Sequence, residues 1–161
     1  MKLTIIMFSI LVGGFARAAS HESGNNVKGI IGFSQSAVNF GADYEKRLNG
    51  MGVGGYFLYS SEKKDAGKNQ TISIGAMAPA HVMDDHHLDV YIAPGFGITM
   101  VKGLSPQDDQ TVFGPSVKTG ILFKMTPAVQ LGLDTIYLVN WFSDKVGPSV
   151  TYTNFAVNFG F

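Results

Sequence analysis

The chain has 161 residues, the length of a single domain, and it carries 12 basic and 12 acidic side chains. This balance leaves no basic excess of the kind that nucleic-acid binding requires, so we expect no nucleic-acid partner. The absence of cysteine excludes both a disulfide framework and a lipid-carrying cysteine.

Residues 1–18 form the first predicted element, a cleaved signal peptide. Lys2 supplies a positive charge, residues 3–15 (LTIIMFSILVGGF) an apolar run, and residues 16–18 (ARA) an A-x-A cleavage site. The apolar run is shorter than the roughly 20 residues that a membrane-spanning helix needs. Cleavage removes two basic side chains and no acidic ones, which leaves 10 and 12 and a formal charge of −2. We therefore expect an exported protein whose mature domain is residues 19–161.

The mature chain reads as β-strands separated by turn signals. Apolar residues alternate with polar or small ones from Leu88 to Met100, a period of two that no helix produces. The same alternation recurs up to the final NFAVNFGF, and Asn49-Gly50 is a hairpin signal. Both faces of the first three strands carry apolar residues, so their register stays open. Eight strands are predicted, at residues 27–35, 37–47, 51–61, 70–79, 87–101, 111–125, 128–142 and 149–161.

Two architectures fit eight antiparallel strands after a signal peptide. A soluble lipocalin-like barrel turns its apolar side chains inward around a ligand, whereas an outer-membrane barrel turns them outward to lipid. Alternation shows that each strand has an apolar and a polar face, but it does not show which face lies inside the barrel. Other features of the strands have to decide between the two architectures.

The polar faces of the strands hold small residues and isolated charges of both signs. A water-facing exterior carries dense Lys and Glu, whereas a narrow lumen needs small residues and ions that can pair across it. These faces therefore favour a lumen, and the predicted lumen ionic cluster consists of Asp43, Glu45, Asp89, Lys118, Lys124 and Asp134.

Aromatic side chains gather near the predicted strand ends. Two aromatic girdles are typical of a barrel that crosses both interfaces of a membrane. Closure of the last strand on the first would also remove the edge that a soluble sheet leaves exposed. The predicted girdle residues are Phe33, Phe40, Tyr44, Tyr56, Tyr59, Phe113, Phe123, Trp141, Tyr152, Phe159 and Phe161.

With these features the chain resembles the small outer-membrane β-barrels of Gram-negative bacteria, the OmpA transmembrane domain and the OmpX-like proteins. The resemblance is carried by the signal peptide, the alternating strands, the segment NFGADYEKRLNGMGVGGYF (39–57) and the terminal NFGF. It implies an all-β fold, an eight-stranded antiparallel up-and-down transmembrane β-barrel in the outer membrane. It also implies contact with lipid including lipopolysaccharide, recognition of the strand ending at Phe161 by the barrel-assembly machinery, and a monomer.

An even number of strands places both termini on the periplasmic side. The outer loops are then expected near residues 34–37, 61–70, 102–110 and 142–149, and the inner turns at 47–51, 79–87 and 125–128. Outer loops are the long ones in such barrels, but here they are short and the inner turn APAHVMDDHH is long. This pattern argues against an adhesin built on extended loops.

The interior of an eight-stranded barrel is just wide enough for side chains to fill. The predicted ionic cluster is therefore interpreted as a plug whose charges neutralise one another, and the alternative is a narrow passive ion path. We expect a structural or surface-interaction role without a cofactor.

Metal binding and catalysis have weak support in the sequence. His81, Asp84 and His86 are ligand-type residues, but neighbours in a strand point to opposite faces, so no metal is expected. Some barrels of this architecture are lipid-modifying enzymes, which need a histidine base near the outer leaflet. His21, His81, His86 and His87 all fall in the N-terminal tail or the predicted inner turn, so we expect no enzyme.

Overall fold

A computed structural model describes residues 24–33, 37–48, 50–64, 67–102, 109–141 and 149–161. The predicted signal peptide lies outside the described residues, as do His21 and most of the predicted outer loops. The described chain consists of β-strands: β1 (Gly24–Phe33), β2 (Ala37–Leu48), β3 (Met51–Lys64), β4 (Gly67–Met77), β5 (Ala80–Asp84), β6 (Leu88–Lys102), β7 (Gln110–Thr126), β8 (Val129–Val139) and β9 (Ser149–Gly160). No helix in these residues is long and apolar enough to cross a membrane.

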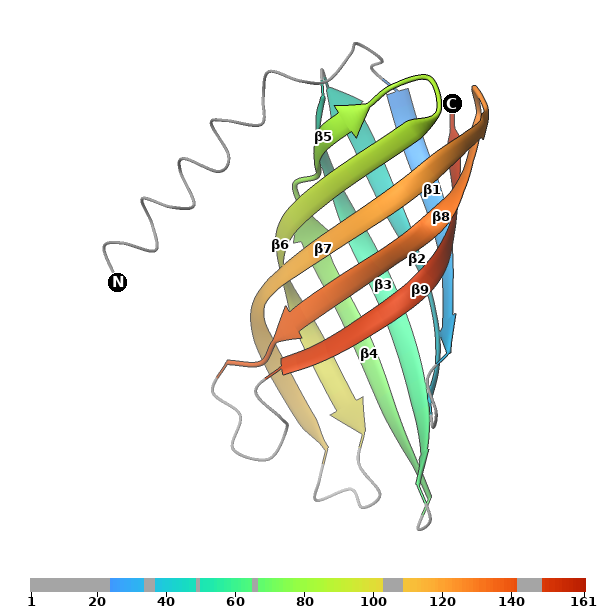
Figure 1. Cartoon of the computed structure of the whole chain (residues 1–161). Helices are drawn as coiled ribbons and strands as arrows, with labels where there is room; N and C mark the ends of the chain where they lie inside the picture. Colours follow the sequence, from blue (N-terminus) through green and yellow to red (C-terminus); the bar gives the residue numbers. More distant parts are fainter. Residues whose placement is uncertain (1–23, 34–36, 49, 65–66, 103–108, 142–148) are drawn as a thin grey trace, which may run out of the picture.

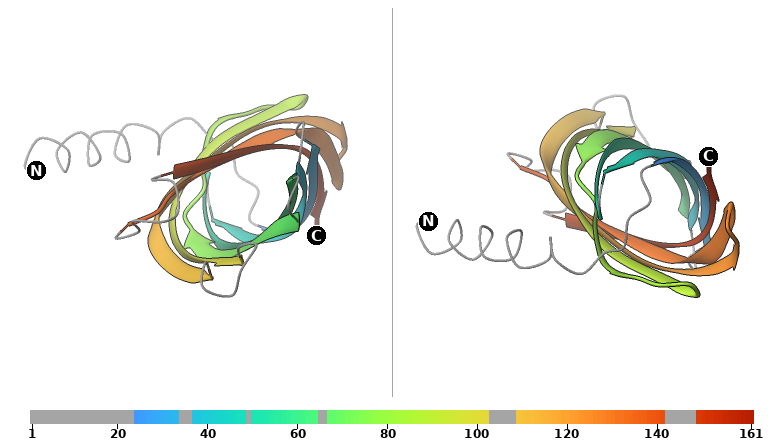
Figure 2. Two further views of the ribbon diagram at one scale, coloured as in Figure 1. Left: turned by 90° about the horizontal axis from the view of Figure 1, so that it is seen from below. Right: turned by 90° about the horizontal axis from the view of Figure 1, so that it is seen from above.

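The strands form one closed antiparallel barrel (Figure 1). Neighbours run in the order β2-β1-β9-β8-β7-β6-β4-β3, and the pairing of β2 with β3 closes the ring that Figure 2 shows along the barrel axis. The last strand pairs with the first from Asn26↔Gly160 to Ile31↔Phe155. The predicted all-β, eight-stranded, up-and-down fold is confirmed.

The short strand β5 continues β4 along the same neighbour. Strand β4 pairs with β6 as far as Met77↔Gly95, and β5 resumes that pairing at Ala80↔Ile92. Pro79 lies in the gap, where it has no N–H to give to the ladder. The long inner turn expected at residues 79–87 is therefore wrong, because a proline interrupts a strand there without ending it. The turn itself is residues 85–87.

Burial shows which face of each strand is inside. On β7 the side chains of Val112, Ser116, Lys118 and Leu122 are buried, and those of the intervening odd-numbered residues point outward. The exposed exterior is apolar in every long strand, including Ile31, Val53, Ile74 and Phe155. The exterior is therefore apolar and the charged side chains lie inside, which is the arrangement of a membrane barrel and the reverse of a lipocalin-like one.

The strand ends differ from the predicted ones mainly at the outer loops. Strand β3 runs to Lys64 and β4 begins at Gly67, so most of the loop expected at 61–70 is strand. At the opposite end, where β5 and the C-terminus lie in Figure 1, tight turns connect the strands. Gly50 has a φ of 81° in the turn between Leu48 and Met51, as the Asn-Gly signal predicts. We call this end of the barrel the turn-side end.

Candidate functional site in the barrel lumen

Five side chains from five strands meet near the middle of the lumen. This central cluster consists of Lys28, Asp43, Tyr91, Lys118 and Asp134. The Lys118 ammonium contacts the Asp43 carboxylate and lies 3.1 Å from Asp134 Oδ2. Lys28 Nζ donates a hydrogen bond of 2.5 Å to the Tyr91 hydroxyl. Two lysines face two aspartates, so the central cluster is formally neutral.

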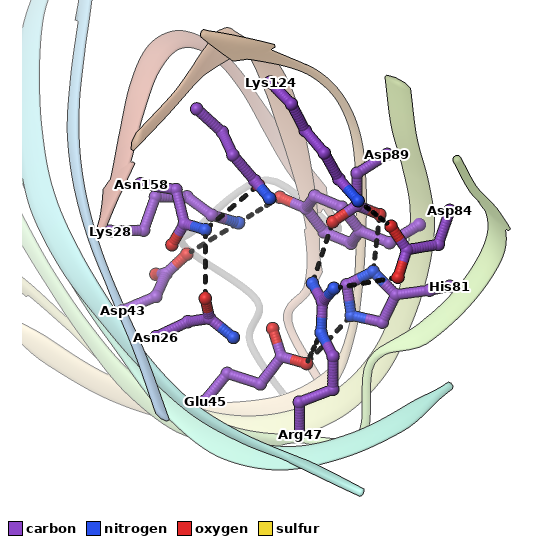
Figure 3. Close-up of polar contacts among 12 residues, drawn as sticks. Asn26, Lys28, Asp43, Glu45, Arg47, His81, Asp84, Asp89, Lys124 and Asn158 are labelled. Carbon is purple, nitrogen blue, oxygen red and sulfur yellow. Dashed lines mark hydrogen bonds and ion pairs between the residues drawn. The ribbon is translucent and has the colours of Figure 1, made fainter. Parts of the chain in front are cut away.

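A second group of ions lies between the central cluster and the turn-side end. Figure 3 shows its members pointing toward one another across the lumen. Arg47 bridges two carboxylates, with Nη2 2.8 Å from Asp89 Oδ2 and Nη1 3.2 Å from Asp84 Oδ2. Lys124 Nζ reaches the other oxygen of Asp84 at 2.5 Å. The turn-side cluster consists of Glu45, Arg47, His81, Asp84, Asp89 and Lys124.

His81 lies at the centre of the turn-side cluster and is 1% exposed. Its Nδ1 is 2.5 Å from Asp89 Oδ1 and its Nε2 is 2.8 Å from Glu45 Oε1. Ionised carboxylates only accept hydrogen bonds, so both contacts need a proton on the nitrogen or on the facing oxygen. A neutral histidine supplies only one of these two protons. If His81 also carries the second, the cluster has three positive and three negative groups; if a carboxyl group holds it, there are two of each. Either way the cluster is neutral with the proton and carries one negative charge without it.

Inward-facing glycines make room for the large side chains of the lumen. A Cβ at Gly120 would lie 2.4 Å from Cε1 of Tyr91, and a Cβ at Gly75 would lie 2.5 Å from the ring of Tyr56. A Cβ at Gly52 would lie 2.3 Å from Oε1 of Glu45. The small residues of one strand therefore fix the rotamers of large residues on its neighbours.

Apolar side chains fill the lumen beside the ionic clusters. Leu58, Leu122 and Ile136 are each 1–2% exposed, and they pack with Ile30, Tyr56 and Leu138 in one hydrophobic cluster. The lumen of the described barrel is therefore occupied by ionic groups and by apolar groups that pack against one another.

The structure places all six residues of the predicted lumen ionic cluster inside the barrel. They divide between the two groups: Asp43, Lys118 and Asp134 are central, whereas Glu45, Asp89 and Lys124 are turn-side.

Sequence reasoning missed further members of both clusters. They are Lys28, Arg47, His81, Asp84 and Tyr91. Asn26-Lys28-Ile30 and Asp43-Glu45-Arg47 continue the inward alternation of their strands, so the period of two could have revealed Lys28 and Arg47.

Most predicted girdle residues lie on the exterior in two bands. The band away from the turn-side end contains Phe33, Phe40, Tyr59, Phe113 and Trp141. The rings of Phe40 and Tyr59 pack against each other with centroids 4.8 Å apart and planes tilted by 34°. The band at the turn-side end contains Tyr44, Phe123, Phe159 and Phe161.

Tyr56 and Tyr152 are not girdle residues. Tyr56 is 5% exposed inside the lumen, and Tyr152 packs against the buried apolar cluster. Both predictions are wrong because the residues fall on inward positions of strands whose two faces both carry aromatic groups.

The three weak metal candidates are not brought together. His81 uses both ring nitrogens on carboxylates, Asp84 is bonded to Arg47 and Lys124, and His86 is exposed in the turn. No group of side chains suited to a metal ion occurs among the described residues.

The turn between β5 and β6 is held by its own aspartate. Asp85 Oδ1 accepts hydrogen bonds of 2.7 Å from the backbone N–H groups of His87 and Leu88. These two donors lower the pKa of the Asp85 carboxyl group, because they stabilise its ionised form. His86 and His87 in this turn are exposed and lie outside the lumen. They line an open cavity of about 640 Å³ at the turn-side mouth of the barrel.

Comparison with known proteins was made by sequence and by fold. Neither a protein-family model nor a curated protein sequence matches the chain. Solved structures do match. Neisserial surface protein A is similar over 86% of this chain and 95% of its own, with a TM-score of 0.65 and 18% identity.

Two further barrels extend this likeness. The N-terminal β-barrel domain of Pseudomonas aeruginosa OprF has a TM-score of 0.66 at 10% identity, covering 88% of this chain and all of that domain (100%). The Yersinia pestis outer membrane protein Ail, in a phospholipid bilayer nanodisc, has a TM-score of 0.58 at 17% identity and covers 87% and 100%. The predicted resemblance to small outer-membrane barrels is confirmed at the level of the fold, and a barrel of this fold contacts lipid with its apolar exterior.

Proposed function

We propose that this chain is an integral outer-membrane barrel with a structural or surface-interaction role, whose lumen is closed by its own side chains. The observation that carries the proposal is the filling of the lumen. Lys118, Asp89 and Asp134 are at most 1% exposed, and the apolar groups of the lumen are also buried. An ion path would need charged groups that water can reach, because bare ions are not stable in a low-dielectric interior.

The short connections support an envelope role more than an extended adhesive surface. Strands β1 and β2 are separated only by residues 34–36, and β3 and β4 only by 65–66. We place the turn-side end in the periplasm, because short turns face that side in barrels of this type.

Conductance across a planar lipid bilayer tests the closed lumen. The purified, refolded protein is expected to give no unitary current steps at 100 mV, while a porin reconstituted in the same way gives them. Reproducible steps that scale with protein concentration would contradict the closed lumen and establish the alternative, a narrow passive channel.

We also propose that the protein is not an enzyme. The described histidines all lie in the turn-side half of the barrel: His81 inside the turn-side cluster, His86 and His87 in the turn. Mass analysis of lipid A from cells with and without the protein is expected to give identical species. A change in acyl chain number that depends on the protein would contradict the proposal.

The structural role has its own test in cells. Deletion of the gene is expected to sensitise cells to SDS and to large antibiotics, and the wild-type chain is expected to restore resistance. Unchanged sensitivity would contradict an envelope role and leave surface interaction as the function to pursue.

The remaining parts of the proposal concern location and partners. We propose, by analogy with barrels of this type, export by residues 1–18, contact with lipopolysaccharide, recognition of the C-terminal strand by the barrel-assembly machinery and a monomeric state. Outer-membrane fractionation is expected to recover the protein together with lipopolysaccharide, and cross-linking is expected to leave it at the position of a monomer. A soluble periplasmic fraction or a discrete dimer would contradict these parts.

A further inference from the structure

A small cavity lies between the central and turn-side clusters. Its volume is about 10 Å³, close to the roughly 10–15 Å³ that one water molecule needs. The lining includes Lys28 and Asp43 from the central cluster, Glu45 from the turn-side cluster, and Asn158 from β9. Figure 3 shows these four side chains around the same part of the lumen. The lining also includes Met77 and Pro79, so the cavity offers both polar and apolar groups, and its size suits one water.

Two buried acceptors at this cavity lack a partner within the protein. They are Asp43 Oδ1 and Asn158 Oδ1, on residues that are 4% and 2% exposed. The Asn158 amide donates through Nδ2 to Asn26 Oδ1 at 3.3 Å and to Gln130 Oε1 at 3.1 Å. With Nδ2 used on these two acceptors, Oδ1 is the atom of the Asn158 amide that has no partner. Both orphaned oxygens therefore need a donor that the protein does not supply.

A donor to the water is also present. Lys28 Nζ donates to Tyr91, whereas its distances to Asp43 Oδ2 and Asp134 Oδ2 are 3.6 Å and 4.0 Å. An ammonium group has three N–H donors, so Lys28 can offer one to a molecule in the cavity. A positive group in the lining also disfavours a metal cation there.

We propose that this cavity binds one water molecule that donates to Asp43 Oδ1 and Asn158 Oδ1 and accepts from the Lys28 ammonium. Three hydrogen bonds are the usual number for a buried water. Because Asp43 belongs to the central cluster and Glu45 of the turn-side cluster lines the same cavity, the water lies where the two clusters meet. The proposal rests on the cavity and its orphaned acceptors and is independent of the physiological role of the barrel.

The wild-type protein provides the deciding test. A crystal structure at a resolution that shows ordered water is expected to have one density peak within hydrogen-bond distance of both orphaned oxygens. In detergent micelles, the Asn158 side-chain amide protons are expected to show a nuclear Overhauser effect to a long-lived water. An empty cavity, or a metal ion at coordination distances, would overturn the proposal.

A pair of variants tests the role of Asn158. Asn158→Leu removes one acceptor and is expected to abolish the density peak. Asn154→Leu is the matched control, because Asn154 is also buried on the inner face of β9 but donates to Asp134, away from the cavity. The control is expected to keep the water. A water that persists in Asn158→Leu would overturn the assignment, and the wild-type measurement decides the proposal even if this variant does not fold.

Discussion

Lys118 shows how a charge is tolerated inside this barrel. It is 1% exposed, and its ammonium contacts the carboxylates of Asp43 and Asp134. A buried pair of this kind is weak evidence for stability, because desolvation offsets much of the attraction. Removal of one partner is different, since it leaves the other charges buried and uncompensated.

We therefore expect Lys118→Met to lower the free energy of unfolding by about 3–5 kcal/mol. Urea titration of the refolded barrel in detergent measures this. The control Lys46→Met changes an exposed lysine of β2 and should have little effect. Adding Asp43→Asn to Lys118→Met should recover part of the loss, because it removes the unpaired carboxylate. Equal, small effects of the two lysine substitutions would show that Lys118 does not balance the central cluster.

The turn-side cluster predicts a pH dependence through the number of protons it holds. His81 contacts Glu45 from β2 and Asp89 and Tyr91 from β6. The other charged groups of the cluster are Arg47 from β2, Asp84 from β5 and Lys124 from β7. Because both contacts of His81 need a proton, the folded protein holds one proton at His81, Asp89 and Glu45 that an unfolded histidine loses near neutral pH. Stability falls with rising pH wherever the folded state binds more protons.

The urea midpoint is therefore expected to decrease between pH 6 and pH 9 in the wild type. His81→Gln should flatten this dependence, because the glutamine side chain does not hold the extra proton. His86→Gln, at an exposed position of the neighbouring turn, should keep the wild-type slope. A slope that survives in His81→Gln would show that the extra proton is not held at the His81 contacts.

At the scale of the strand, the complementarity of glycine and tyrosine determines how the lumen packs. Gly120 on β7 faces Tyr91 on β6, and the two residues are cross-strand partners. A methyl group at position 120 would overlap the Tyr91 ring, whereas a methyl group at Gly29 on β1 would have no heavy atom of a neighbour within 4 Å. Substituting alanine at both positions therefore separates the cost of overpacking, expected only at Gly120, from the effect of alanine on the backbone, expected at both.

We expect Gly120→Ala to destabilise the barrel by about 1–3 kcal/mol through overpacking. Gly29→Ala, on an outward position, should be neutral or slightly stabilising, because alanine reduces the entropy of the unfolded chain. Unfolding midpoints of the two variants in the same detergent give the comparison. A Gly120→Ala variant as stable as Gly29→Ala would mean that Tyr91 moves aside without loss.

The strands also show which parts of the fold were accessible from the sequence. Alternation from Leu88 onward identifies the faces of β6 to β9, because small and polar residues predominate on one side of each, although large residues such as Leu122 and Ile136 also lie on that side. It did not identify β5, since Pro79 and the histidines resemble a turn. The register shift between His81 and Met83 adds to the difficulty, because it brings both His81 and Asp84 to the lumen face, which strict alternation does not allow.

For the whole molecule, closure of the barrel pairs β1 with β9, the first and last strands of the described chain. Asn25 and Phe161 exchange two backbone hydrogen bonds of 2.9 Å, so the last residue is paired and not frayed. A closed barrel has no free edge strand, so the first and last strands of the described chain both find backbone partners within the sheet. Loss of the β1–β9 pairing, which we call the seam, should open the barrel along its length.

The seam can be tested with two substitutions at one outward position of β9. Val157 pairs with Gly29 on β1 and with Leu131 on β8. Proline there removes a ladder hydrogen bond and is tolerated only at an edge, whereas leucine keeps both the backbone pairing and the apolar exterior. In SDS gels of unheated samples, the wild type and Val157→Leu should migrate faster than the boiled chain. Val157→Pro should lose this fast band. If it kept the heat-dependent shift, the β1–β9 pairing would not be what holds the barrel closed in detergent.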